Sequence, residues 1–388
     1  MIKGVILAGG IGERLRPLTE SIPKALAPVH GVPMLRKQIL ALHDLGISDI
    51  VVLTGYRADM IHSYIARTFP YSNPRVTCIE TPVHYSPAER LIASRLEIGD
   101  DFLLLYCDNL VSDSKTIQKV IESDSPLTFL LESRGEGNVS IEPLVKYETS
   151  RSASTPYVEL GYIHVNTPLF FDALEECESL PHALSKMSNT QNCKSFITTM
   201  KLESTSTMKR LINLRTSRRT VLLDRDGILN YKMPPRTYLT KMDEYSPQES
   251  VVSTIASKLA SQTDFLIITN QPGIATGAVS PEFIDKLHSR IIVELLLNGI
   301  SVIGLYVCPH HWDINCECRK PKPGMLNQAI LDYQLHREAL VYVGDEEKDL
   351  EAAAAAGIAG VRISNETGDS TYQSLDEALP FIESVLNR

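Results

Sequence analysis

Short apolar runs alternate with amphipathic stretches along the first hundred residues of the chain. In the runs the hydrophobic residues are continuous, as in strands buried on both faces; between them, apolar residues recur every three to four positions, as on one face of a helix. Strands that alternate with helices predict an α/β fold, with a parallel sheet covered by helices on both faces. The predicted strands cover residues 3–8, 50–53, 76–79 and 102–107, and the predicted helices cover residues 33–45, 58–66 and 87–96.

The same alternation returns after residue 220, so the sequence predicts a second doubly wound α/β domain. Between residues 176 and 220 the pattern weakens, and the basic segment from Arg215 to Arg219 is most simply a solvated linker. At 388 residues the chain is long enough for two or three domains, and we predict one over residues 1–215 and one over residues 216–388. In the second domain strands are predicted at 221–223, 265–268 and 339–343, and helices at 251–259, from Ser280 onward and at 350–356.

The composition, with 43% hydrophobic and 22% charged residues, is ordinary for a globular protein. A net charge of −9, without a long run of Lys and Arg, argues against a nucleic-acid partner. The longest apolar stretch, residues 291–307, is broken by Glu294, Asn298 and Gly299, so it predicts a helix end, a turn and a strand and no membrane span. No basic region precedes a long apolar run at the start, so we expect no signal peptide and a cytoplasmic protein.

A glycine-rich loop follows the first predicted strand. Glycines let the backbone approach a ligand closely and point N–H groups at phosphate oxygens. A dinucleotide-binding pattern starting at Gly10 would need a glycine where Leu15 stands, and no phosphate loop ending in Gly-Lys-Ser/Thr is present. Glycines followed by cations suit a polyphosphate, although by spacing alone a solvated loop with incidental charges explains them equally well. The glycines are Gly9, Gly10 and Gly12, and the cations are Arg14, Arg16 and Lys24.

A carboxylate closes the last strand of this first set. Asp108 follows the apolar run at 102–107, and such sheets bind ligands at the edge formed by the carboxyl ends of their strands. Asp108 could hold a divalent metal ion or merely cap the next segment. We favour the metal, because the glycine loop and its cations are expected at the same edge.

Residues 7–19, Leu-Ala-Gly-Gly-Ile-Gly-Glu-Arg-Leu-Arg-Pro-Leu-Thr, and residues 22–29, Ile-Pro-Lys-Ala-Leu-Ala-Pro-Val, resemble the sugar-1-phosphate nucleotidylyltransferase family. Tyr-Val-Glu-Leu-Gly-Tyr at 157–162 resembles its acceptor-sugar segment, so the resemblance covers roughly residues 1–215. It implies a Rossmann-like sheet that holds a nucleoside triphosphate, with catalysis by positioning and charge stabilisation. In the implied roles Gly9, Gly10 and Gly12 wrap the triphosphate, Arg14 and Lys24 neutralise its phosphates, Asp108 binds Mg²⁺, and Glu159 and Gly161 bind the acceptor sugar.

This half departs from the family pattern in two places. Tyr-Ser-Pro-Ala-Glu at 85–89 stands where the family has a Gly-Thr-Ala-like segment, and the family's second metal aspartate is matched by Glu203. Glutamate still ligates Mg²⁺, but its longer side chain shifts the geometry. The departures leave open an alternative hypothesis, in which the N-terminal half is a non-catalytic sensor of sugar nucleotides.

The apolar run at 221–223 ends in Asp224, Arg225, Asp226 and Gly227. Residues i and i+2 of a strand lie on the same side, so Asp224 and Asp226 are predicted to face one point and Arg225 to point away. Two carboxylates at one point require a cation or a shared proton between them. An Asp-Gly hairpin turn is the simpler reading. We favour the site, because later strands end in complementary groups: Thr269 and Asn270, then Arg319 and Lys320, then Asp345 and Asp349.

Four soft metal ligands lie within eleven residues of the C-terminal half. Cys308-Pro-His310 is followed by Cys316-Glu-Cys318, which together fit a closed tetrahedral Zn²⁺ site, with His311 as a spare. The chain's seven cysteines are an odd number, and the crowding of three of them beside histidines favours metal ligation in a reducing compartment over disulfides.

The strand ends with Asp-x-Asp, Thr, Lys and Gly-Asp-(x)3-Asp resemble the haloacid-dehalogenase-like phosphatases over residues 220–361. Within them, the zinc loop and Cys-Arg-Lys-Pro-Lys-Pro-Gly-Met at 318–325 resemble the D-glycero-D-manno-heptose 1,7-bisphosphate phosphatases, while histidinol-phosphate phosphatases share the zinc loop. The resemblance implies a covalent mechanism that depends on Mg²⁺ and a structural Zn²⁺. In the implied roles Asp224 is the nucleophile and Asp226 is the general acid and base. The Mg²⁺ ligands are Asp224, the backbone of Asp226 and Asp345. Thr269, Asn270 and Lys320 lie at the phosphoryl group, and Arg319 binds the other phosphate.

Taken together, the two resemblances imply a bifunctional enzyme. The C-terminal half would remove the C7 phosphate of a heptose bisphosphate, and the N-terminal half would transfer a nucleotidyl group, with GTP as the favoured donor, to the heptose 1-phosphate that remains. Its partners would be heptose phosphates and a nucleoside triphosphate.

Overall fold

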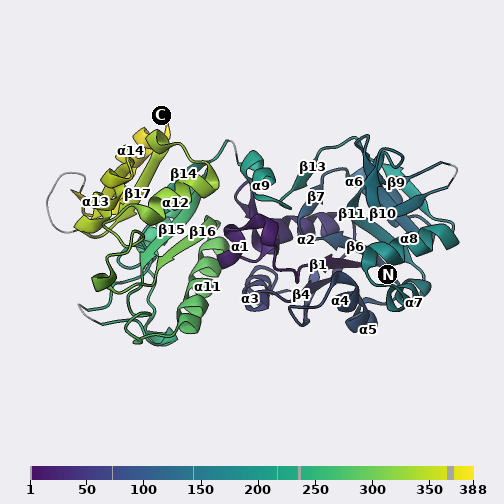
Figure 1. Cartoon of the computed structure of the whole chain (residues 1–388), viewed down its shortest axis with the longest axis horizontal. Coiled ribbons are helices and arrows are strands. Elements are labelled where there is room, and N and C mark those ends of the chain that lie inside the picture. Colours follow the sequence, from purple (N-terminus) through teal and green to yellow (C-terminus); the bar gives the residue numbers. More distant parts are fainter. Residues whose placement is uncertain (1, 72, 143, 216, 235–236, 365–370) are drawn as a thin grey trace. The chain divides into compact units, whose positions relative to one another are not determined.

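The computed structural model describes residues 2–71, 73–142, 144–215, 217–234, 237–364 and 371–388. The chain forms two compact units, whose elements are labelled in Figure 1. The first unit consists of residues 1–13, 23–26 and 34–207, and the second of residues 14–22, 27–33 and 208–388.

The first unit is built on a nine-stranded mixed sheet. Its path runs β10-β9-β11-β6-β1-β4-β5, with β8 paired to β11 and β12 paired to β8. The four strands β5, β4, β1 and β6 are parallel, whereas β11 runs antiparallel to β6, β8 and β9. The strands are β1 (Lys3–Leu7), β4 (Asp49–Thr54), β5 (Arg75–Glu80), β6 (Asp101–Tyr106), β8 (Leu127–Ser133), β9 (Gly137–Ser140), β10 (Lys146–Ser152), β11 (Tyr157–Asn166) and β12 (Lys194–Ile197). The helices are α2 (Met34–Asp44), α3 (Ala58–Thr68), α4 (Pro87–Ala93), α5 (Arg95–Ile98), α6 (Ser114–Ile121), α7 (Leu169–Glu176) and α8 (Leu180–Thr190).

The strands and helices predicted over the first hundred residues are confirmed, with shifts of one or two residues at their ends, except that the helix predicted over residues 87–96 is divided at Ser94 into α4 and α5. The antiparallel part of the sheet, β8 to β11, was not predicted. Strand β10 shows why, because six of its seven residues are exposed and it therefore lacks the apolar alternation that marks a half-buried strand.

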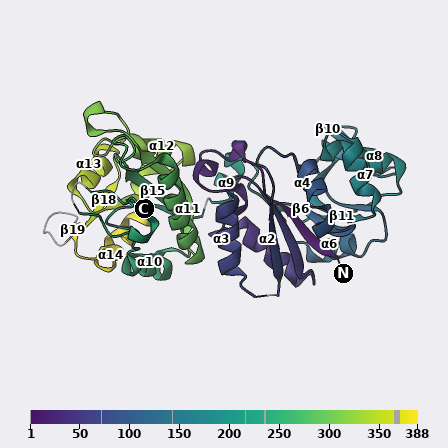
Figure 2. The ribbon, with the colours of Figure 1, turned by 90° about the horizontal axis from the view of Figure 1, so that it is seen from below.

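The second unit contains a six-stranded sheet that is parallel throughout, in the order β16-β15-β14-β17-β18-β19. Figure 2 shows α12 and α13 on one face of this sheet and α10 and α14 on the other, as the doubly wound prediction requires. The strands are β14 (Arg219–Leu223), β15 (Thr263–Asn270), β16 (Ser301–Cys308), β17 (Leu340–Gly344), β18 (Ala359–Ile363) and β19 (Thr371–Tyr372). The helices are α1 (Leu18–Ser21), α9 (Met208–Leu214), α10 (Glu249–Thr254), α11 (Pro281–Leu297), α12 (Gly324–Tyr333), α13 (Glu347–Ala355) and α14 (Leu375–Leu386), with a π-helix at Ile255–Leu259 that continues α10.

The predicted strands and helices of this half are confirmed as well. Ser280 caps α11 by accepting a hydrogen bond from the Phe283 amide, and residues 291–307 divide into the end of α11, a turn and β16. Within the described part of the chain, none of the helices combines the length and the apolarity that a membrane span requires.

The basic segment in front of β14 is not a solvated linker, so that interpretation is wrong. The Nε atoms of Arg215 and Arg218 lie 2.6 Å and 2.8 Å from the carboxylate of Asp264, and all three side chains are buried. Asp264 belongs to β15, and a carboxylate buried there requires compensating cations. The arginines therefore belong to the packed interior of the second unit.

Candidate active sites

Two adjacent parallel strands and the helix that follows the second one place three carboxylates together in the second unit. Strands β14 and β17 pair in register up to Leu223 and Val343, so Asp224 and Asp345 leave the same edge of the sheet. Asp349 lies one turn further, in α13, and contributes a third carboxylate. The ligand atoms of these three residues lie within 4.8 Å of one another. The sequence prediction that Asp224, Asp345 and Asp349 share one edge agrees with this geometry.

Lys320 lies between two of these carboxylates. Its Nζ is 2.9 Å from Oδ1 of Asp224 and 2.8 Å from Oδ1 of Asp349, and it donates a hydrogen bond of 2.7 Å to the hydroxyl of Tyr342. Burial opposes its charge, but Asp224 and Asp349 raise the pKa of Lys320 above its ordinary value. Burial raises the pKa of Asp224, and the Lys320 ammonium opposes that rise. The lysine therefore offsets part of a local excess of negative charge.

The carboxylates at this edge fit a divalent cation. Oδ1 of Asp345 is buried and has no hydrogen-bond partner among the described residues, which is costly unless a cation uses it. Gly227 makes room for this carboxylate, because a Cβ atom there would lie 2.4 Å from its Cγ. Burial raises the pKa of Asp345, while Lys232, whose Nζ lies 2.8 Å from Oδ2, opposes the rise. Hard oxygen ligands at this spacing suit Mg²⁺.

The Asp226 side chain does not join this group. Arg225 lies 2.7 Å from its Oδ2, and Asn230 and Gln271 donate hydrogen bonds of 3.0 Å and 2.8 Å to its carboxylate. Burial opposes ionisation, but Arg225 and these hydrogen bonds lower the pKa of Asp226 below its ordinary value. Arg225 thus does not point away as predicted; it folds back onto Asp226 and also contacts Nε2 of His288 at 3.0 Å.

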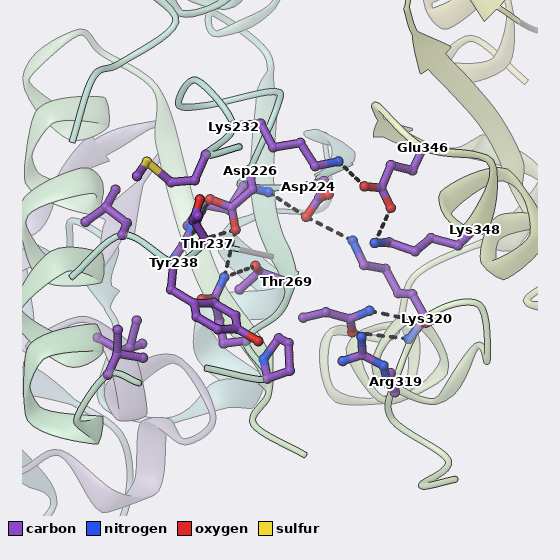
Figure 3. Close-up of a pocket in the computed structure, with 18 of the residues that line it drawn as sticks. Asp224, Asp226, Lys232, Thr237, Tyr238, Thr269, Arg319, Lys320, Glu346 and Lys348 are labelled. Atoms are coloured by element: carbon purple, nitrogen blue, oxygen red, sulfur yellow. Dashed lines mark hydrogen bonds and ion pairs between the residues drawn. The ribbon is translucent and has the colours of Figure 1, made fainter. Parts of the chain in front are cut away.

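A pocket of about 870 Å³ opens above these residues. Figure 3 shows Asp224, Thr269 and Lys320 approaching one another in it, with Lys232, Glu346 and Lys348 forming a chain of ion pairs alongside. Asn270 also lines the pocket, but its amide is used to hold the backbone of Lys320 through two hydrogen bonds of 3.2 Å. The predicted residues on its wall are Asp224, Asp226, Thr269, Asn270, Arg319 and Lys320.

The two cysteine-containing segments meet in space. The Cys308 and Cys316 sulfurs lie 3.7 Å apart, the Cys316 and Cys318 sulfurs 3.5 Å, and Nδ1 of His310 is 3.1 Å from the Cys318 sulfur. These spacings are too long for disulfides, and all three cysteines are free. With Zn–S bonds of about 2.3 Å, the edges of a tetrahedral site are about 3.7 Å long, so the four ligands fit Zn²⁺.

In the first unit Asp108 lies just beyond β6 and is largely buried. Its Oδ2 lies 2.5 Å from Nζ of Lys24. Strand β13 (Leu202–Ser204) pairs antiparallel with β7 (Asn109–Val111), which places Glu203 beside the segment that follows Asp108. Glu203 has a lysine of its own, Lys37, at 3.3 Å. Asp108 thus directly precedes β7, Glu203 lies in the strand paired with β7, and each of these two carboxylates is ion-paired.

The predicted acceptor-sugar residues lie at the same edge. Gly161 has a φ of 78°, its amide donates to the Glu159 carboxylate, and a Cβ there would lie 2.7 Å from the Tyr106 ring, so only glycine fits. Asn109 donates a hydrogen bond of 2.9 Å to the Leu160 carbonyl. Burial raises the pKa of Glu159 to about 7, although the Gly161 amide opposes the rise.

The predicted glycines lie in the loop after β1, where Gly9 is buried, Gly10 is exposed and Gly12 has a φ of 72°. Arg14 is exposed and belongs to a segment that groups with the second unit.

Several residues with direct contacts at these sites were missed by the sequence reasoning. Tyr342 was hidden in the apolar run of β17, and Gln271, which directly follows the predicted residues Thr269 and Asn270, was not predicted as a site residue. Lys232 and Arg90 carry no local signal, because their partners are remote in sequence. Arg90 contacts the Gly9 carbonyl 81 residues away.

Comparisons with known proteins agree with this division. The family described as Nucleotidyl transferase matches residues 3–136, and the family described as HAD-hydrolase-like matches residues 317–380. A D-glycero-beta-D-manno-heptose-1,7-bisphosphate 7-phosphatase from Pseudomonas putida is 35% identical over 153 residues, which are 39% of this chain and 86% of the relative.

Two solved structures are also similar to parts of the chain. One is D,D-heptose 1,7-bisphosphate phosphatase from B. bronchiseptica complexed with magnesium and phosphate, with 30% identity, a TM-score of 0.36, and coverage of 41% of this chain and 86% of that one. The other is HddC from Yersinia pseudotuberculosis complexed with GMP-PN, with 20% identity, a TM-score of 0.46, and coverage of 55% of this chain and 98% of that one. The two family matches and the Pseudomonas putida relative, and not these two structures, show that the chain carries a nucleotidyl transferase domain and a HAD-like phosphatase domain.

Proposed function

Because the chain belongs to the D-glycero-β-D-manno-heptose-1,7-bisphosphate 7-phosphatase family, we propose that its C-terminal half, residues 216–388, hydrolyses the C7 phosphate of that sugar bisphosphate. The observation that carries this proposal is the approach of Asp224, Asp345 and Asp349 to within 4.8 Å of one another, with Lys320 between two of them. Phosphoryl transfer to a carboxylate requires this combination of nucleophile, cation site and fixed ammonium.

In the proposed mechanism an oxygen of Asp224 attacks phosphorus, and the bond between phosphorus and the C7 oxygen breaks as Asp226 gives that oxygen a proton. Asp226 must therefore be protonated when the substrate is bound, although Arg225 favours its ionised form in this structure. Water then attacks the phosphorus of the aspartyl-phosphate while Asp226 takes up a proton from it, which releases inorganic phosphate and restores Asp224. The Thr269 hydroxyl and Lys320 hold the phosphoryl oxygens, and Arg319 on the pocket wall binds the 1-phosphate.

We propose that Asp224, Asp345 and the backbone carbonyl of Asp226 hold Mg²⁺. The ion supplies positive charge that offsets the charge on the phosphoryl group. We propose a structural Zn²⁺ on Cys308, His310, Cys316 and Cys318, because the four ligand atoms have tetrahedral spacing. It would fix the loop that carries Trp312 and Arg319 to the pocket wall.

For residues 1–215 we propose nucleotidyl transfer to the resulting heptose 1-phosphate. A phosphate oxygen of the sugar attacks the α-phosphorus of a nucleoside triphosphate, GTP being favoured, and pyrophosphate leaves. Lys24 and, from the sequence motif, Arg14 would neutralise the phosphates, while Asp108 and Glu203 are the proposed Mg²⁺ ligands. Glu159 and Gly161 would bind the sugar, since both lie at the carboxyl end of β6 beside Asp108.

The test is a substrate panel on the full chain with Mg²⁺. Heptose 1,7-bisphosphate and histidinol phosphate are compared for phosphate release, and heptose 1-phosphate is supplied with GTP, ATP, CTP or UTP for pyrophosphate release. Asp224→Asn should abolish phosphate release and leave nucleotidyl transfer nearly unchanged. Faster cleavage of histidinol phosphate would contradict the heptose assignment. Absence of transfer with every nucleotide would favour the sensor hypothesis, which the ion-paired state of Glu203 also motivates.

A further inference from the structure

Arg90 is a buried cation in the first unit. It lies in α4, directly after residues 85–89, where the sequence departs from the nucleotidylyltransferase pattern, and only 3% of it is exposed. An arginine side chain does not deprotonate in proteins, so its charge persists in the interior.

The guanidinium is held by the ends of three parallel strands. It donates to the carbonyls of Gly9, Thr54 and Val83 at 3.0 Å, 3.1 Å and 2.9 Å, and to the hydroxyl of Thr81. These acceptors lie at or just after the ends of β1, β4 and β5, at the carboxyl edge of the sheet. No carboxylate among the described residues forms an ion pair with Arg90, so its direct partners are backbone carbonyls and one hydroxyl, all of them neutral. A buried cation in this state favours an anion nearby.

The bond from Arg90 to Gly9 fixes a peptide plane. The Gly9 carbonyl also accepts a hydrogen bond of 3.0 Å from the Tyr56 amide, so it is held on two sides. The bond between Gly9 and Gly10 is trans, which means that the Gly10 N–H points opposite to the Gly9 carbonyl. Gly10 is exposed, and a Cβ there would meet nothing within 4 Å. The backbone of Gly10 is therefore open to the approach of a ligand.

The loop backbone is shaped around this side chain. A Cβ on Gly9 would lie 2.4 Å from Cζ of Arg90, and a Cβ on Gly55 would lie 2.5 Å from its Nη1. A Cβ atom at either position would therefore clash with Arg90, and at Gly55 also with the Gly9 carbonyl at 2.8 Å. A shorter side chain at 90 would remove the guanidinium that bridges the two loops and leave the Tyr56–Gly9 hydrogen bond between them.

We propose that Arg90 is a positioning residue of the nucleotide site: it holds the Gly9 carbonyl so that the Gly10 N–H faces a triphosphate, and it places a fixed positive charge beneath that anion. The proposal rests on the nucleotide site assigned above to the first unit. It concerns binding of the phosphates and not of the acceptor sugar, whose proposed residues Glu159 and Gly161 do not contact Arg90.

The test compares Arg90→Gln and Arg90→Lys in the full chain. Binding of inorganic pyrophosphate, of GTP with Mg²⁺ and of heptose 1-phosphate is measured by titration calorimetry. Arg95→Gln is the matched control, because Arg95 lies in the next helix, is partly exposed and pairs with Asp172 at 3.7 Å. Arg90→Gln should lower the affinity for pyrophosphate and for GTP about tenfold or more, and the affinity for heptose 1-phosphate less than about twofold. Arg90→Lys, which keeps the charge but cannot reach all the carbonyls, should lie between it and the wild type.

Equal weakening of all three ligands would show a merely structural role and would overturn the proposal, as would pyrophosphate binding within twofold of wild type. Should Arg90→Gln not fold, Arg90→Lys decides by the same criteria. If the wild-type chain binds GTP and pyrophosphate but transfers no nucleotide, the proposed nucleotidyl transfer is refuted. The role of Arg90 is still tested in that case, because it is judged from binding constants and not from turnover.

Discussion

Replacing Lys320 by methionine tests the charge balance of the phosphatase site. Methionine keeps most of the side-chain volume but removes the ammonium that lies 2.9 Å from Asp224 and 2.8 Å from Asp349. Both carboxylates then stay buried without this partner. Phosphate release should be lost as well, because Lys320 is proposed to hold the phosphoryl group.

The expected loss of stability is large. Removing one partner of a buried ion pair costs about 3–5 kcal/mol. For a unit of this size each kcal/mol lowers the melting temperature by roughly 2–4 °C, so the second unit should melt roughly 6–20 °C lower. The control is Lys322→Met, two residues further on. Lys322 pairs with Glu317, whose side chain is 87% exposed, and such surface pairs are worth about 0–1 kcal/mol.

Thermal and urea unfolding followed by tryptophan fluorescence suit this measurement. Trp312 is the only tryptophan of the chain and belongs to the second unit, so its signal reports that unit. The comparison is made in buffer without Mg²⁺, since the metal would itself compensate the carboxylates.

The deficit should also depend on pH. Burial already raises the pKa of Asp224 in the folded state to about 7, and without the opposing Lys320 ammonium this pKa rises further, so the folded state binds more protons than the unfolded state. The free energy of unfolding of Lys320→Met therefore falls as pH rises from the unfolded to the folded pKa of this carboxylate. The difference in unfolding free energy between wild type and Lys320→Met becomes smaller as pH falls. If Lys320→Met were as stable as Lys322→Met at neutral pH, the buried carboxylates would not depend on Lys320, and the reasoning would be refuted.

Three further predictions test other parts of the structure. Asp264→Asn should destabilise the second unit by about 3–5 kcal/mol, because Arg215 and Arg218 lose their carboxylate, while kcat of the folded enzyme stays unchanged; a loss under 1 kcal/mol in urea unfolding would contradict this. Cys316→Ser should abolish zinc binding, measured by elemental analysis of the purified chain, whereas Cys78→Ser, outside the cluster, should not. Glu159→Gln should stabilise the first unit relative to wild type at pH 8 but not at pH 4. The pKa of the buried Glu159 is raised to about 7, so the wild type loses stability as pH rises from the unfolded pKa of this carboxyl to about 7. Glutamine does not ionise and therefore does not show this loss. An equal effect at both pH values would count against it.

The sequence predicted the elements of the second unit and the edge where its acidic residues meet. Both predictions depend on local patterns, since an apolar run that ends in a carboxylate marks the carboxyl end of a buried strand. The cysteine and histidine cluster was visible for the same reason, because its ligands are at most ten residues apart.

What the sequence did not predict depends on partners that are far apart. Arg225 was expected to point away, but the alternation of a strand no longer applies once the chain leaves β14, and its long side chain folds back onto Asp226. Arg218 and Asp264 are 46 residues apart, and Arg90 and Gly9 are 81 apart. Which buried charges meet is decided by the packing of the sheet and not by neighbouring residues.

The ion pairs of Asp264 bear on where the chain can be cut to study the phosphatase by itself. A fragment that starts at residue 216 would lack Arg215 and would leave the aspartate with Arg218 alone. One that starts at Met208 would retain α9 and both arginines. The two fragments differ by only eight residues at their start, yet we expect the longer one to be the more stable, and its melting point is the one to compare with the intact protein.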